Sequence, residues 1–152
     1  MESPDRNGEL FVRPMEPGDA DAVSRLIEQL GYSRSPQEVL EWIAGVGAGD
    51  RQAAFVACQA GEVVGWIEVA IERRLQYVPF ALVGGLVVQE GLRGQGIGRL
   101  LCRHAEEWAW EHGAEKVRVT SRSTRVDAHR FYVRDGYQPV KTSMVFEKTR
   151  SS

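Results

Sequence analysis

Residues 93–99 form a glycine-rich segment, Arg93-Gly94-Gln95-Gly96-Ile97-Gly98-Arg99, whose residue types suit the binding of phosphate. An apolar run precedes the segment and a helical pattern follows it. Free backbone N–H groups are therefore expected at a helix N-terminus, where the helix dipole favours an anion. Glycine at 94, 96 and 98 removes the Cβ atoms that would hold a pyrophosphate away from these N–H groups. Arg93 and Arg99 add charged donors.

Two common phosphate-binding patterns do not account for this segment. A Walker P-loop requires Gly-Lys-Ser/Thr, whereas Arg99 and Leu100 follow Gly98. A Rossmann fingerprint needs glycine where Arg99 stands and normally opens the fold, whereas this segment lies past the middle of the chain. A glycine-rich connection that binds no ligand remains the alternative.

Glu68 is a second candidate for chemistry, because it stands inside an apolar strand pattern. Residues 53–59 and 63–71 predict an antiparallel hairpin around Ala60-Gly61-Glu62. Alternation in the second strand places Val63 and Ile67 on one face, and Trp66 and Glu68 on the other. A carboxylate in a central strand is usually paired or faces a cavity, so both a solvated or salt-bridged acid and a catalytic group explain it.

The remaining elements follow from hydrophobic periodicity and from turn residues. Further strands are predicted at residues 10–14, 81–88 and 116–121, and a closing hairpin at 138–142 and 144–147. Helices are predicted at residues 22–30, capped by Asp19 or Asp21, and at 36–43, capped by Ser35. Two more are predicted from Ile97 to Gly113 and from a Thr124–Asp127 capping box to Gly136.

Gly84 and Gly85 are unusual inside the predicted strand 81–88. Glycine weakens a strand interior and often marks a β-bulge or the close approach of a ligand or another backbone. The pair therefore predicts a bulge, which either packing or a bound molecule would explain.

Length and charge limit the classes of protein that fit. The 152 residues, 43% of them hydrophobic, predict one domain at residues 9–150 behind a disordered tail at 1–8. With 19 basic and 21 acidic residues, neither nucleic acid nor a membrane is expected as a partner. No stretch resembles a leader or a membrane span, so a cytoplasmic location is expected. Cys58 and Cys102 stand in apolar segments and are expected to be buried free thiols.

Two motifs resemble those of the GNAT superfamily of N-acetyltransferases. Residues 93–98 match Arg/Gln-x-x-Gly-x-Gly/Ala, which that family uses to hold the pyrophosphate of acetyl-coenzyme A. Residues 131–137, Phe-Tyr-Val-Arg-Asp-Gly-Tyr, are similar to its Phe-Tyr-x-x-x-Gly-Phe/Tyr segment. The motifs stand in the expected order, and the predicted elements from 10 to 148 match its βααβββαβαββ sequence. The resemblance implies an α/β (α+β) fold with a central mixed, mostly antiparallel splayed sheet and helices on both faces.

The resemblance also implies a chemistry, acetyl transfer from acetyl-coenzyme A to an amine by direct attack in a ternary complex without a metal. Tyr132 would donate a proton to the departing thiolate. Many members carry a glutamate two residues before the position of Leu86, where this chain has Gly84. Glu68 acting through a water, or no dedicated base, are the remaining options. The positions that match cofactor-binding residues are Leu86, Val87, Val88, Arg93, Gly94, Gln95, Gly96, Ile97, Gly98, Arg99 and Asp127.

The expected acceptor is the primary amine of a small molecule, as in small bacterial amine or aminoglycoside acetyltransferases that the chain resembles. The alternatives are a peptide or protein N-acetyltransferase and an inactive coenzyme A-binding sensor. A homodimer is expected because dimers are common in the family. Acidic and aromatic residues of the first two helices suit a cationic amine, although they are also ordinary on a solvated helix face: Glu28, Tyr32, Glu38, Glu41 and Trp42.

Overall fold

The computed structural model describes residues 8–46, 49–121 and 124–150, which divide into two compact units after Thr120. The first unit holds a β-sheet and three α-helices, and the second holds one described helix. The tail expected over residues 1–8 lies, apart from Gly8, outside the described residues. None of the described helices is long and apolar enough to cross a membrane.

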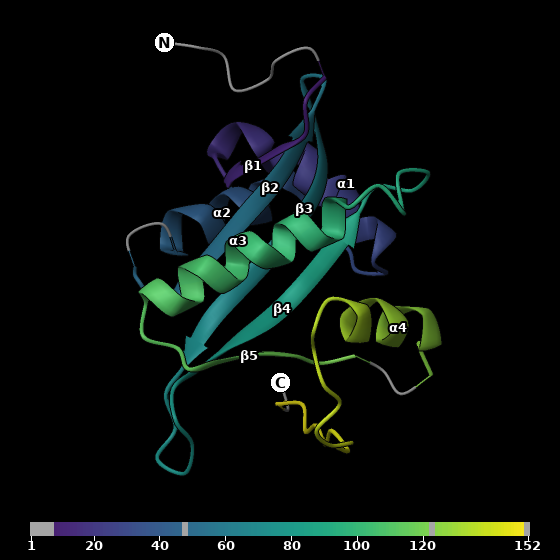
Figure 1. The fold of residues 1–152 in the computed structure, drawn as a ribbon. Helices are drawn as coiled ribbons and strands as arrows, with labels where there is room; N and C mark the ends of the chain where they lie inside the picture. The colour runs from purple at the N-terminus through teal and green to yellow at the C-terminus, as the bar shows by residue number, and fades with distance from the viewer. Residues whose placement is uncertain (1–7, 47–48, 122–123, 151–152) are drawn as a thin grey trace. The chain divides into compact units, whose positions relative to one another are not determined.

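The sheet of the first unit has five strands in the order β1-β2-β3-β4-β5. Neighbouring strands from β1 to β4 are antiparallel, and β5 alone runs parallel to β4 (Figure 1). The prediction of a mixed, mostly antiparallel sheet is therefore confirmed. The strands are β1 (Phe11–Pro14), β2 (Gln52–Gln59), β3 (Glu62–Glu72), β4 (Phe80–Val88) and β5 (Lys116–Val119).

Helices cover both faces of this sheet, as predicted. The α3 helix (Ile97–Glu111) crosses one face, and α1 (Ala20–Gln29) and α2 (Pro36–Val46) lie on the other, with a short 3-10 turn η1 (Pro17–Asp19) before α1 (Figure 1). A Cβ atom on Gly65 of β3 would lie 3.0 Å from Leu101 Cδ1 of α3. On the opposite face, Trp66 packs in one buried cluster with Val23 of α1 and Val39 of α2.

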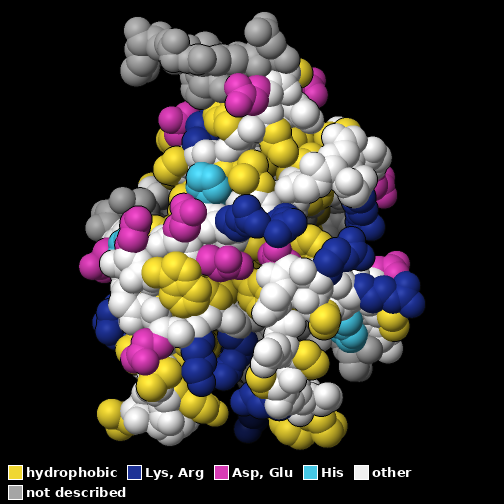
Figure 2. All heavy atoms as spheres, viewed as in Figure 1, with side chains coloured by type: hydrophobic (Ala, Val, Ile, Leu, Met, Phe, Trp, Pro, Cys, Tyr) yellow, Lys and Arg dark blue, Asp and Glu magenta, His cyan; other side chains and the backbone are white. Residues whose placement is uncertain are grey.

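Figure 2 shows basic and acidic side chains interspersed over α3.

A bulge in β3 corrects one predicted detail. The register shifts so that Val64 has no partner on β2. Such an extra residue reverses the alternation of side chains before it. As a result Val63 packs against the α1–α2 cluster that contains Trp66, and it does not share the face of Ile67. The predicted face of Val63 was wrong, because a period of two holds only within one continuous ladder.

In the second unit, the helix α4 (Val126–Arg134) is terminated by Gly136, as predicted. Gly136 has φ 96°, a left-handed conformation that costs glycine little. Its N–H donates to Val133 O at 3.1 Å, and the Tyr137 N–H donates to Tyr132 O at 2.9 Å. The rings of Tyr132 and Tyr137 meet edge to face with centroids 5.8 Å apart. This is the Schellman arrangement with its apolar contact.

Two predictions for the C-terminal region are wrong. The first residue before α4 is Arg125, with no side-chain cap, so Thr124 and Asp127 do not form the predicted capping box. The runs 138–142 and 144–147 form no strand. Their apolar side chains stay exposed, so these runs bury no face of the kind that stabilises a hairpin. The exposed residues are Val140 (74%), Met144 (80%), Val145 (80%) and Phe146 (85%).

The start of α1 is held by a buried ion pair. Asp19 occupies the predicted N-cap position, but its carboxylate accepts hydrogen bonds from Arg13 Nη1 at 2.7 Å and Nη2 at 2.8 Å. It also accepts from the Glu16 N–H at 2.8 Å. Burial raises the pKa of Asp19, but the hydrogen bonds and the charge of Arg13 outweigh burial, so the pKa lies below its ordinary value.

Replacing Asp19 by Asn should lower the free energy of unfolding near pH 7 by about 2–3 kcal/mol, because Arg13 loses its charged partner. The depressed pKa means that the wild-type contribution is complete above the unfolded-state value of about 3.9 and is lost as pH falls through the folded-state value. Urea unfolding measured from neutral to acid pH should therefore give a flatter profile for Asp19→Asn. The exposed Asp21→Asn is the control, and parallel profiles for wild type and Asp19→Asn would contradict this account.

Candidate functional site

The predicted bulge lies in β4 at Gly84. Glu68 of β3 stands opposite Gly85, and the next pair is Val69 with Val83, which leaves Gly84 without a partner. An extra residue of this kind bends a strand and re-aims its side chains. The prediction drawn from the glycine pair is confirmed.

Neighbouring side chains occupy the space that a Cβ atom would need at either glycine. A Cβ on Gly84 would lie 2.8 Å from Glu68 Oε1, and a Cβ on Gly85 would lie 2.7 Å from Cζ3 of the Trp66 ring. The two glycines therefore admit a carboxylate and an indole of β3 against the backbone of β4. Packing within the chain explains both positions.

Beyond the bulge, β4 has a free edge. The strand β5 pairs only with residues 80–83 of β4, and no described strand lies beside Gly84 to Val88 on that side. The Gln89 N–H donates to Val64 O at 2.8 Å, which fixes the phase of the antiparallel ladder. In such a ladder alternate residues turn their N–H and C=O groups away from the partner strand. With this phase, Leu86 and Val88 direct theirs to the free edge, and Val87 directs its groups to β3.

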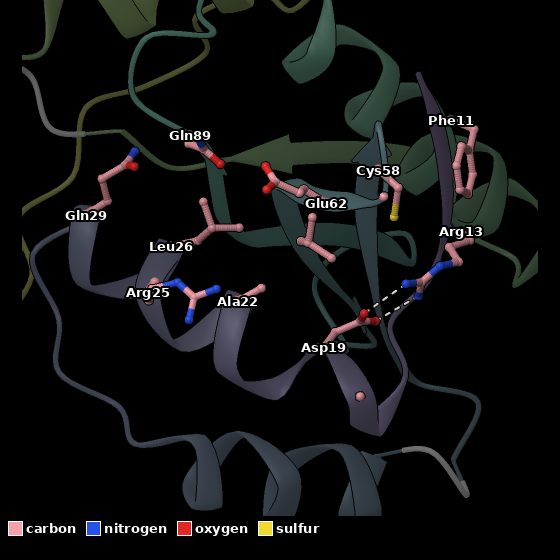
Figure 3. A pocket seen from close by; sticks show the side chains of 13 residues that line it. Phe11, Arg13, Asp19, Ala22, Arg25, Leu26, Gln29, Cys58, Glu62 and Gln89 are labelled. Carbon is pink, nitrogen blue, oxygen red and sulfur yellow. Dashed lines mark hydrogen bonds and ion pairs between the residues drawn. The ribbon is translucent and has the colours of Figure 1, made fainter. Parts of the chain in front are cut away.

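The Gln29 side chain, at the end of α1, holds the end of β4. Its Nε2 donates to Val88 O at 2.8 Å, and its Oε1 accepts from the Glu90 N–H at 3.0 Å. Figure 3 shows Gln29 and Gln89 near one another at one end of a hollow beside α1. The amide thus bridges the last residue of β4 and the connection that leads to α3.

The glycine-rich turn has the geometry that the sequence predicted. Gly94 and Gly96 have φ 84° and 82°, and Gly96 is the N-cap of α3. The first helical bond runs from the Leu100 N–H to Gly96 O at 3.1 Å. Within the described parts of the chain, no backbone acceptor takes a hydrogen bond from the N–H groups of residues 93–98. Free donors therefore stand at the N-terminus of a 15-residue helix.

A hollow of about 650 Å³ lies on the α1–α2 face of the sheet at the bulge. Glu68 lines it and, among the described residues, makes no hydrogen bond or ion pair. Burial raises the pKa of the Glu68 carboxyl. The lining residues, all in the first unit, are Met15, Val23, Ile27, Leu30, Tyr32, Arg34, Glu38, Val39, Glu41, Trp42, Trp66, Glu68, Gly84 and Gly85.

The wall of this hollow also contains an unpaired donor. Trp66 is 7% exposed, and its buried indole N–H has no partner among the described residues. A buried donor without an acceptor costs about 1–3 kcal/mol. Together with the unpaired carboxylate of Glu68, it indicates a surface that is completed by a bound molecule or by water.

A second hollow of about 770 Å³ lies between α1 and the ends of β2 and β3 (Figure 3). Two of its charged side chains, the half-buried Arg13 and the buried Asp19, form an ion pair with one another. The larger hollow therefore contains an ion pair with a structural role, whereas the smaller hollow contains the unpaired acid Glu68. The smaller hollow is the candidate site for chemistry.

Residues 20–137 match the model of the Acetyltransferase (GNAT) family, which is well over half of the chain. The chain belongs to this family of acetyltransferases.

Three relatives illustrate the match. An aminoalkylphosphonate N-acetyltransferase of Salmonella typhimurium is 40% identical over 84 residues, which are 55% of this chain and only about half, 54%, of that protein. An uncharacterized N-acetyltransferase of Chlorobaculum tepidum is 31% identical over 137 residues, 86% of this chain and 76% of its own. A solved aminoglycoside N-acetyltransferase AAC(6')-Iy in complex with CoA shares the fold, with a TM-score of 0.83, 16% identity, and coverage of 97% and 99%.

The GNAT motif residues fall in both units. In the first unit, the ladder between β3 and β4 places Glu68 beside β4, whose edge is free. A short connection then joins β4 to the start of α3. Tyr132 lies half-buried on α4 of the second unit, where its ring also meets Phe131 edge to face with centroids 5.2 Å apart. Asp127 is exposed in the first turn of α4. No pattern in the sequence indicated a role for Gln29 or for the unpaired Trp66 N–H.

Alanine at the two bulge glycines should separate their roles. Gly85→Ala should lower the free energy of unfolding by about 1–3 kcal/mol, because a buried ring must move. Gly84→Ala should cost less, because the Glu68 carboxyl is the far end of a flexible side chain and can turn away. Urea unfolding checks both, with Gly45→Ala in α2 as control, where a Cβ meets nothing within 4 Å. A Gly84→Ala cost equal to that of Gly85→Ala would refute the distinction.

Proposed function

We propose that this protein transfers the acetyl group of acetyl-coenzyme A to a primary amine of a small molecule, by direct attack in a ternary complex. The observation that carries the proposal is the unpaired Glu68 carboxylate in a hollow at the bulge of β4. The same strand leads directly into the free N–H groups at the start of α3. The proposed base on β3 thus lies beside the bulge of β4, and β4 and its connection lead from there to the proposed anion site.

Acetyl-coenzyme A would bind along that strand. Its pyrophosphate suits the N–H groups of residues 93–98, with Arg93 and Arg99 as charged donors. Its amide-rich arm suits the free edge of β4, where Leu86 presents its N–H and C=O groups and Val88 its N–H, as an added strand would. Asp127 stays a prediction that rests on the motif alone. The name of the AAC(6')-Iy complex, which contains CoA, supports this cofactor.

Glu68 is the proposed general base. The acceptor must lose a proton to become a neutral amine, and a carboxylate whose pKa is raised by burial is better matched to that transfer than an exposed one. The family resemblance implies a glutamate at the position of Gly84. Here Glu68 Oε1 lies 2.8 Å from the point where a side chain at 84 would begin, so the neighbouring strand supplies a carboxylate at that place.

The transfer itself forms a C–N bond and breaks a C–S bond. The neutral amine attacks the thioester carbonyl, and the departing thiolate takes a proton. Tyr132 is the proposed donor, since its ordinary pKa of about 10 is close to that of a thiol at about 8.5. This role rests on the Phe-Tyr motif. Holding both substrates together supplies much of the remaining rate enhancement.

The size of the hollow favours a small acceptor over a protein. A volume of about 650 Å³, bounded by two helices and the sheet, is of the size that binds small molecules. A peptide or protein N-acetyltransferase and an inactive sensor are the alternatives. A homodimer and a cytoplasmic location stay predictions.

The proposal is tested by thiol release from acetyl-coenzyme A with a panel of amines. Wild type should release thiol only when an acceptor is present, and Glu68→Gln should lower kcat by about 10²–10⁴ without loss of coenzyme A binding. Because the base must be deprotonated, wild-type kcat should rise with pH through the pKa of Glu68, and Glu68→Gln should lose that dependence. Tyr132→Phe should also lower kcat.

Glu107→Gln, an exposed acid of α3, is the matched control and should behave as wild type. Coenzyme A binding without any acceptor-dependent thiol release would favour the sensor. Turnover of peptides but of no small amine would favour the protein acetyltransferase.

Gln29 is proposed to position the cofactor strand. Gln29→Met removes both hydrogen bonds at the end of β4 and should raise KM for acetyl-coenzyme A about tenfold, with a smaller change in kcat. Steady-state kinetics with the exposed Gln37→Met on α2 as control separates this effect from a general loss of stability. A fall in kcat with unchanged KM would mean that Gln29 does not position the cofactor.

A further inference from the structure

We infer that the preferred acceptor is a diamine: its reacting amine lies at Glu68, and its second amine lies, as an ammonium, at Glu41. This inference rests on the proposed function and specifies its substrate class. It excludes as a good substrate any amine whose second group is an anion, such as an aminoalkylphosphonate.

The charges that line the hollow carry the argument. Four charged residues line it: Glu38, Glu41, Glu68 and Arg34. Two of these four charges are already paired with one another, since Arg34 Nη1 lies 3.0 Å from Glu38 Oε2. Two acids remain for a ligand, and a bound molecule with two positive charges would balance them.

Glu38 is held in a structural role as well. Its Oε1 accepts from the Ser35 N–H at 3.0 Å, and the Glu38 N–H donates to Ser35 Oγ at 3.1 Å. This is a capping box at the start of α2. A ligand would have to break it to recruit Glu38 or to free Arg34.

The two remaining acids approach the hollow from different elements. Glu68 stands on β3 of the sheet, and Glu41 stands on α2, which covers that face. Glu41 is exposed and makes no hydrogen bond or ion pair with the described residues. A ligand that meets both acids must therefore carry its cationic groups at two separate points.

Apolar and aromatic side chains form the wall between these acids. Val23 and Ile27 of α1 and Trp42 of α2 line it together with Trp66 of the sheet. Such a wall suits the methylene groups of an alkyl chain, and aromatic faces also attract ammonium groups. An apolar linker between two amines matches this arrangement.

An anionic substituent lacks a partner in this hollow. Arg34 is the only cation among its lining residues, and it is ion-paired. A phosphonate would meet Glu41 and Glu68, and like charges at close range repel. The relative from Salmonella typhimurium is named for aminoalkylphosphonates, so the two proteins should differ in acceptor.

The experiment compares cadaverine, n-pentylamine and aminoethylphosphonate as acceptors at saturating acetyl-coenzyme A. Wild type should show kcat/KM about tenfold higher for cadaverine than for n-pentylamine, and lowest for aminoethylphosphonate. Glu41→Gln should remove the preference for cadaverine over n-pentylamine. Glu41→Lys should reverse the order of cadaverine and aminoethylphosphonate. Glu28→Gln, an exposed acid of α1 that does not line the hollow, is the control.

Calorimetric titration of the full chain with the same three amines separates this inference from the proposed function. Tighter binding of cadaverine that Glu41→Gln abolishes would support the inference even if no acceptor were turned over, in which case the proposed function would fail alone. Turnover with equal kcat/KM for all three amines, or a preference for the phosphonate, would overturn the inference and leave the proposed function standing. Equal changes in Glu28→Gln and Glu41→Gln would also overturn it.

Discussion

The site depends on one steric constraint, the absence of side chains at two successive residues of β4. Without Cβ atoms at Gly84 and Gly85, the Glu68 carboxyl and the Trp66 ring can lie against the backbone of β4. The bulge at the same point coincides with the end of pairing between β4 and β5. Local packing thus creates both an acid in a hollow and a free strand edge, which are the two features on which the proposed acetyl transfer depends.

The helix α1 joins this region to the rest of the first unit. At its start, Asp19 is bonded to Arg13 of β1, and at its end, Gln29 is bonded to Val88 and Glu90. Residues between these ends line both hollows. Because polar contacts fix the helix at both ends, the wall of the smaller hollow and the end of β4 keep one relative position.

Sequence patterns predicted those features that depend on local conformation. Two kinds of local feature lie at their predicted positions. These are the left-handed glycines Gly96 and Gly136, and the capping box of Ser35 and Glu38. Features set by contacts between distant segments escaped prediction. The bulge that turns Val63, and the bonds of Gln29, which lies 59 residues from Val88, leave no periodic signal. The prediction of a C-terminal hairpin was wrong because it rested on the local pattern alone. An isolated hairpin is not stable unless its apolar face packs against another surface.

The proposed role of Glu68 illustrates why a missing motif residue does not imply missing chemistry. A base must occupy a point in space, and across an antiparallel ladder two strands reach the same point, with Cβ atoms of facing residues about 4.5–5.5 Å apart. A side chain at 84 would displace the Glu68 carboxyl from it, because the Cβ at 84 would meet Glu68 Oε1 at 2.8 Å. The glycine at 84 and the glutamate at 68 are therefore one arrangement. A search for the base along a single strand finds only the glycine, whereas the register of β3 and β4 finds the acid.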